Sequence, residues 1–175
     1  MNNESNEKLI EHIRVKVNNR WHEFQVGKDI NSSDSLSKVL REKLGLTGVR
    51  VSCEQGACGA CTVLLNGEAV LSCMMLVVEA DGCEIITIEG LDKEDEVVDA
   101  FINLSEPGYG TAMQCGFCTP GFVLETHSLL NKNPNPSLAE IREGLSGHIC
   151  RCGCYPGIAK AALNAAEKRC CKEEK

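Results

Sequence analysis

The chain has 175 residues, of which 43% are hydrophobic and only 4% aromatic, and its formal net charge is −7. A chain of this length can bury one medium-sized hydrophobic core or two small ones, and small cores are only marginally stable. The twelve cysteines are several times the ordinary usage, which indicates that disulfides or bound metal supplement the packing. The acidic balance argues against a nucleic-acid partner, and the lack of a long apolar run argues against a membrane span.

The N-terminal extension, residues 1–11, favours bound metal over disulfides. It is polar and contains neither an apolar signal segment nor a twin-arginine pair. We therefore expect a cytoplasmic protein. Disulfides do not persist in a reducing compartment, whereas thiolates remain free to bind metal.

Residues 12–91 predict a small α+β unit. Apolar and polar residues alternate at its start, and a later segment places its apolar residues on one helical face. An Asn-Gly pair between two apolar runs is the strongest short hairpin signal. The expected elements are, in chain order, a hairpin turning at Asn18-Asn19, a helix over 35–45 that ends at Gly45, a hairpin turning at Asn66-Gly67, and a strand over 84–88.

Residues 92–168 change to a helical pattern and predict a compact bundle of about four helices. Thr119 and Pro120 suit an N-cap followed by proline at the first helical position. Ser137 with Glu140 three residues later has the pattern of a capping box. Further helices are expected after Asp92 and around Ile158, and residues 169–175 are expected to form a charged tail.

Four cysteines in the first half have the spacing of plant-type 2Fe-2S ferredoxins, because CEQGACGAC is followed by a further cysteine beyond the second hairpin. Gly56 and Gly59 allow this loop to turn sharply, so that backbone N–H groups can point at a cluster. A zinc site or four buried core cysteines are the alternatives, but zinc loops usually pair two short knuckles. The candidate ligands are Cys53, Cys58, Cys61 and Cys73.

The second half contains two more cysteine motifs, QCGFCTPG and CRC. Cys118 precedes the helix expected at Pro120, where N–H groups and the positive end of the helix dipole stabilise a negatively charged cluster. Taken alone, CxxC with CxC is also compatible with a zinc site. Beside the first set, a second iron–sulfur cluster is favoured. The candidate ligands are Cys115, Cys118, Cys150 and Cys152.

Four motifs in this order, CEQGACGACTV, TIEGL, QCGFCTPG and CRC followed by a tyrosine, resemble the iron–sulfur subunits of the xanthine dehydrogenase family. That family of molybdenum hydroxylases includes aldehyde oxidoreductases, carbon monoxide dehydrogenase, nicotinate dehydrogenase and 4-hydroxybenzoyl-CoA reductase. The resemblance extends from about Ile13 to Ala166. It implies an α+β fold, with a ferredoxin-like β-grasp domain followed by a four-helix 2Fe-2S-binding bundle.

The resemblance also implies a function. The chain would relay single electrons between a molybdopterin on a large partner subunit and a flavin or external carrier, without catalytic residues of its own. The helical-domain cluster would lie nearest the molybdopterin, which Gln114 would contact, and the other cluster nearer the flavin. A partner subunit carrying FAD, a molybdopterin cytosine dinucleotide and a dimer of heterotrimers are further expectations. A free-standing two-cluster ferredoxin and a structural zinc-binding protein remain as alternatives.

One motif departs from the family pattern. The family usually has Thr-Gly-Tyr after CRC, whereas this chain has Gly153-Cys154-Tyr155. Cys154 is either a small buried side chain in a turn, or an alternative ligand or oxygen-labile site. His148 is expected to pack or hydrogen-bond rather than to bind metal. Three more cysteines are expected to be non-ligands: Cys83, Cys170 and Cys171.

Overall fold

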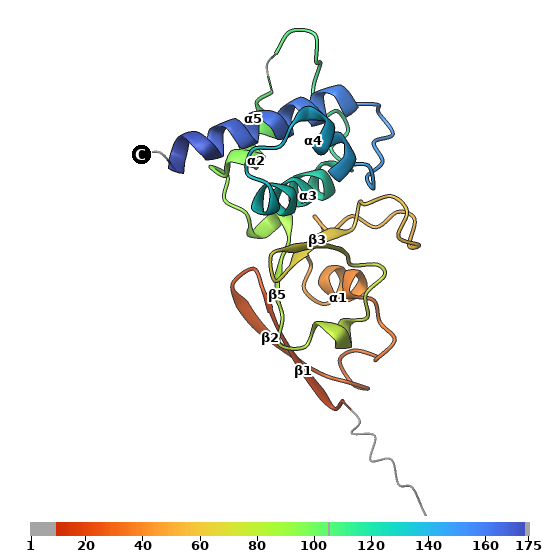
Figure 1. Ribbon diagram of the computed structural model, residues 1–175. Helices are drawn as coiled ribbons and strands as arrows, with labels where there is room; N and C mark the ends of the chain where they lie inside the picture. Colours follow the sequence, from red (N-terminus) through yellow and green to blue (C-terminus); the bar gives the residue numbers. More distant parts are fainter. Residues whose placement is uncertain (1–9, 105, 174–175) are drawn as a thin grey trace, which may run out of the picture.

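The computed structural model describes residues 10–104 and 106–173. Figure 1 shows a sheet with one helix at one end of the molecule and the other α-helices at the opposite end. The predicted α+β class is therefore confirmed. We call the sheet with its helix the sheet half, and the remaining α-helices the helical half. Each half has its own cluster of buried apolar residues.

The sheet contains five strands in the spatial order β2-β1-β5-β3-β4. β1 and β5 are parallel, and the other neighbouring strands are antiparallel. Both predicted hairpins are present, since β1 pairs with β2 and β3 pairs with β4. Their turns have the expected positive φ, which is 46° and 68° at Asn18 and Asn19, and 50° and 88° at Asn66 and Gly67. The strands are β1 His12–Val17, β2 Arg20–Gln25, β3 Thr62–Leu65, β4 Glu68–Leu71 and β5 Glu84–Ile86.

Helix α1, Leu36–Glu42, covers one face of the sheet. Its N-cap is Ser35, whose side chain accepts a hydrogen bond from the backbone N–H of Lys38. The helix ends at Glu42, earlier than the predicted Gly45, and Gly45 then reverses the chain with φ of 70°. The core of the sheet half includes Ile13, Val15, Val17, Leu36, Val39, Leu40, Val63 and Ile85.

The helical half contains α2 Glu96–Ile102, α3 Thr119–Lys132, α4 Leu138–Gly144 and α5 Tyr155–Glu173. Ser137 and Glu140 form the predicted capping box at the start of α4. Asp95 is the N-cap of α2, and its carboxylate accepts hydrogen bonds from two backbone N–H groups. No helix within the described residues is long and apolar enough to cross a lipid bilayer.

Two further helix boundaries differ from the prediction. The N-cap of α3 is Cys118 rather than Thr119, and Pro120 then occupies the second helical position, where no intrahelical N–H bond is lost. Helix α5 continues through residues 169–173, where a charged tail was expected. The reason is tertiary, because Arg169 lies 2.7 Å from the Glu96 carboxylate of α2.

The two halves pack together where α3 lies against β3 and β4 (Figure 1). Ser128 Oγ on α3 accepts a hydrogen bond from Ala69 N on β4 at 3.1 Å. Lys132, at the end of the same helix, forms an ion pair with Glu68. Because β3 directly follows the CEQGACGAC loop, this packing brings that loop to the N-terminal end of α3.

Replacing Asp95 by Ala should lower the free energy of unfolding by about 1–2 kcal/mol, since the variant loses an N-cap. The carboxylate accepts from Val97 N and Val98 N at 2.9 and 3.0 Å and also binds His127 of α3. Urea unfolding followed by circular dichroism measures the loss. Glu94→Ala is the control, because the Glu94 side chain is exposed and should change stability little; similar losses in both variants would contradict the capping role.

Candidate metal centres

The first four cysteines lie in the loop before β3 and directly after β4, and we call them the sheet-half set: Cys53, Cys58, Cys61 and Cys73. The loop turns through three residues with left-handed backbone, Glu54, Gly56 and Gly59, with φ of 53°, 74° and 71°. The structure brings the thiols together in two pairs. The side chains of Cys53 and Cys58 are within hydrogen-bonding reach of each other, as are those of Cys61 and Cys73.

Backbone N–H groups and burial act on this set in opposite directions. The N–H groups of Gln55 and Ala57 point at Cys53 Sγ, the second at 3.4 Å, and lower the pKa of that thiol to about 7. Burial raises the pKa of Cys61, which is 3% exposed, to about 11. The loop therefore offers preformed donors to a negatively charged thiolate on one side and excludes water on the other.

The other four cysteines precede α3 and α5, and we call them the helical-half set: Cys115, Cys118, Cys150 and Cys152. The Cys115 side chain is within hydrogen-bonding reach of Cys152, and Cys118 is within reach of Cys150. The charge of Cys150 also acts on Cys115. All four thiols therefore converge on one region, although two come from each of two distant segments of the chain.

Two helix N-termini point at the helical-half set. Cys118 is itself the N-cap of α3. The carbonyl oxygen of Cys154 accepts the first hydrogen bond of α5, from Ile158 N at 2.9 Å. Burial would raise the pKa of Cys150, but the N–H of Cys154 and the thiol of Cys118 outweigh it, so the pKa lies below its usual value. Burial raises the pKa of Cys118 to about 12. The positive ends of two helices thus compensate for a negatively charged group held here.

The paired thiols suit the two irons of a binuclear cluster. In a 2Fe-2S cluster two bridging sulfides leave two thiolates for each tetrahedral iron. Each set consists of two close pairs, and its N–H donors suit the negative charge of such a cluster.

Backbone and side-chain contacts join the two sets. The Cys58 carbonyl oxygen accepts a hydrogen bond from Ile149 N at 3.0 Å, and Ile149 directly precedes Cys150. Gly59 makes this approach possible, because a Cβ there would lie 2.4 Å from the His148 ring. A Cβ at Gly121, in the first turn of α3, would lie 2.3 Å from the Gly59 carbonyl oxygen.

His148 fills the space beside Gly59. Thr62 Oγ1 donates its only proton to Gly59 O at 2.8 Å, so it accepts from His148 Nε2 at 2.9 Å. This fixes the Nε2–H tautomer, and burial lowers the pKa of His148 to about 4, which keeps the ring neutral at pH 7. The predicted hydrogen-bonding role of His148 is confirmed, although its partner lies in the sheet half.

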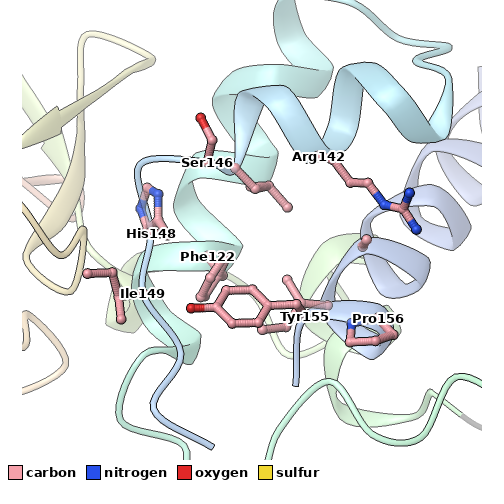
Figure 2. A pocket seen from close by; sticks show the side chains of 10 residues that line it. Phe122, Arg142, Ser146, His148, Ile149, Tyr155 and Pro156 are labelled. Atoms are coloured by element: carbon pink, nitrogen blue, oxygen red, sulfur yellow. The ribbon is translucent and has the colours of Figure 1, made fainter. Parts of the chain in front are cut away.

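A cavity of about 410 Å³ beside the helical-half set was not predicted. Tyr155 OH accepts a hydrogen bond from Cys150 N at 2.9 Å. Figure 2 shows the Tyr155 ring in this cavity, with its hydroxyl directed toward the segment of His148 and Ile149, and Arg142 on the opposite side. The tyrosine after CRC was the only signal in the sequence for this arrangement.

Comparison with known proteins identifies the family of this chain. A family model described as 2Fe-2S iron-sulfur cluster binding domain matches residues 9–106, and one described as [2Fe-2S] binding domain matches residues 87–163. The chain is 40% identical over 153 residues to a probable xanthine dehydrogenase subunit of Bacillus subtilis (strain 168), covering 87% of this chain and 83% of the relative. It belongs to the iron–sulfur subunits of the xanthine dehydrogenase family.

Two further relatives support this membership. The nicotinate dehydrogenase small FeS subunit of Eubacterium barkeri is 44% identical over 135 residues, covering 77% of this chain and 83% of the relative. The crystal structure of quinoline 2-oxidoreductase from Pseudomonas putida 86 matches with a TM-score of 0.78 and 39% identity, over 89% of this chain and 93% of that chain. This iron–sulfur subunit is therefore the electron-transfer component of an oxidoreductase.

The other residues singled out in the sequence lie as follows in the iron–sulfur subunit. Gln114 is exposed beside Cys115. Cys83 contacts the Asp81 carbonyl oxygen before β5. Cys170 contacts the Pro134 carbonyl oxygen near the end of α5, where the neighbouring Cys171 is exposed. All twelve cysteines lie within the described residues and are free thiols.

Replacing Gly59 by Ala is expected to lower the free energy of unfolding more than the same change at Gly82. Both glycines are left-handed, with φ of 71° and 74°, so both variants carry the strain of a left-handed alanine, about 1–2 kcal/mol. Only at Gly59 would the Cβ also meet the His148 ring, whereas at Gly82 nothing lies within 4 Å. Urea unfolding compares the variants, and equal losses would contradict the described contact.

Proposed function

We propose that the two cysteine sets each hold one 2Fe-2S cluster and that the chain relays single electrons between a molybdopterin on a large partner subunit and a flavin or external carrier. Substrate chemistry then takes place on the partner. The observation that carries this proposal is the hydrogen bond between Cys58 O and Ile149 N, which ties the two sets together. A protein with two unrelated structural metal sites has no need of such a connection.

The close pairs of thiols suggest which cysteines share an iron. Each iron takes two thiolates, and each set has two pairs of cysteines within hydrogen-bonding reach. The proposed pairs are Cys53 with Cys58, Cys61 with Cys73, Cys115 with Cys152, and Cys118 with Cys150. When bound, the clusters supply one-electron redox chemistry at potentials that the surrounding hydrogen bonds and burial adjust.

The chain holds the two cluster sites close together and keeps charge away from the segment between them. Cys58 and Cys150 are joined through a single hydrogen bond and the covalent bonds of Ile149, which is a short route for an electron. His148 beside this route stays neutral at pH 7, so it adds no charge between the sites. The route carries electrons in either direction, as the hydroxylases and the reductase branch of the family require.

The exposed side of the helical-half set is the proposed contact with the large subunit. Cys115 and Cys152 are exposed there, beside Met113 and Phe117, which are 38% and 43% exposed. By the family resemblance, Gln114 contacts the molybdopterin, which we expect to carry a cytosine dinucleotide. We further propose that the sheet half is the family's β-grasp domain over residues 12–91, that α2–α5 are its four-helix domain, and that the sheet-half cluster faces an FAD-binding subunit. A cytoplasmic dimer of heterotrimers completes the proposal.

Iron and sulfide analysis of the purified chain tests the cluster assignment. We expect about four irons and about four inorganic sulfides per chain. Cys61→Ser and Cys118→Ser should each lose about half of the iron, because each removes one ligand of one site. Cys83→Ser is the control and should keep all of it. A colourless protein that contains zinc would overturn the assignment.

Affinity purification from the native cells tests the partner. We expect a tagged chain to recover a much larger molybdenum-containing subunit. A brown chain recovered alone, with both clusters, would favour a free-standing ferredoxin instead.

A further inference from the structure

The turn before α5 places Cys154 against Cys150. Gly153, with φ of 77°, folds the chain back after CRC. The backbone N–H of Cys154 then donates to Cys150 Sγ at 3.5 Å. The side chain of Cys154 is only 5% exposed, so water does not compete for its contacts.

The thiol of Cys154 reaches the same sulfur. Its side chain is within hydrogen-bonding reach of Cys150, in addition to the backbone contact. An ordinary thiol is mostly protonated at neutral pH. A protonated thiol next to a thiolate is a donor, so Cys150 receives both an N–H and an S–H from one residue.

Cys154 is better suited to donate than to bind iron. The helical-half set already supplies four thiolates, the full number for one 2Fe-2S cluster.

We propose that Cys154 is a tuning residue of the helical-half cluster, and that its S–H and N–H together raise the reduction potential by donating to the Cys150 thiolate. Reduction adds a negative charge to the cluster, and hydrogen bonds to a ligand sulfur stabilise that charge. A side chain without a donor would keep the N–H contact and lose the S–H contact. The proposal rests on the proposed function, because it takes Cys150 to be a cluster ligand.

Redox titration of the full chain with its clusters, followed by electron paramagnetic resonance, tests the role of Cys154. In Cys154→Ala the helical-half cluster should become harder to reduce, with its reduction equilibrium falling threefold to tenfold, about 28–59 mV. In Cys154→Ser the potential should equal or exceed that of the unmodified chain, because a hydroxyl donates more strongly than a thiol. The iron content should stay the same in both variants.

The same titration contains two controls. The sheet-half cluster of each variant should keep its potential, since Cys154 does not contact that set. Cys83→Ala removes a thiol from the distant turn before β5 and should leave both potentials unchanged.

Three results would overturn the tuning role. The first is an unchanged potential in Cys154→Ala, and the second is an equal drop in the Ser and Ala variants. The third is the loss of about half of the iron in both variants, which would make Cys154 a ligand. If Cys154→Ala fails to fold, Cys154→Ser alone tests the tuning role, because a lower potential of its helical-half cluster also overturns that role. An unmodified chain without two 2Fe-2S signals would instead refute the proposed function itself.

Discussion

The contact between the Gly59 segment and the His148 segment decides how the two halves of the molecule meet. Neither glycine has room for even a methyl side chain, since a Cβ at Gly59 would lie 2.4 Å from the His148 ring and one at Gly121 would lie 2.3 Å from the Gly59 carbonyl oxygen. The approach lets Ile149 N reach Cys58 O, and it lets His148 satisfy Thr62 across the interface. Without it, α3 would still pack against β3 and β4, but no hydrogen bond would join Cys58 to the segment before Cys150.

The two cysteine sets beside this contact receive their N–H donors from different kinds of structure. The sheet-half set receives its donors from a loop that turns through left-handed residues, so its N–H groups are local to the CEQGACGAC sequence. The helical-half set depends on two helix N-termini, and α3 and α5 must pack correctly before Cys118 and Cys150 meet. The hydrogen-bond donors of the first set are therefore mostly local in sequence, whereas those of the second depend on tertiary structure.

The sequence predicted those features that depend on local chemistry. Both hairpins were predictable, because Asn and Gly adopt the positive φ that their turns require. The spacing of the cysteines identified two candidate sets, which the structure gathers in pairs. Features set by distant residues were missed. The segment 169–173 is helical because Arg169 binds Glu96, far away in sequence, and no local pattern indicates this. The N-cap of α3 was misplaced by one residue, since Pro120 is tolerated at either of the first two helical positions. The hydrogen bond from Ile149 to Cys58 depends on the packing of the two halves and could not be predicted from either motif.

Magnetic coupling between the two sites tests the central claim most directly, because it depends on their separation. In the fully reduced chain each cluster carries an unpaired spin, and electron paramagnetic resonance at low temperature detects the interaction of two nearby spins as a splitting or broadening. The contact between Cys58 and Ile149 predicts that each signal is split by the other, and that the splitting disappears when a ligand of the other site is replaced. Two signals that stay unsplit in the fully reduced chain would contradict the account, because the two sites would then not be neighbours.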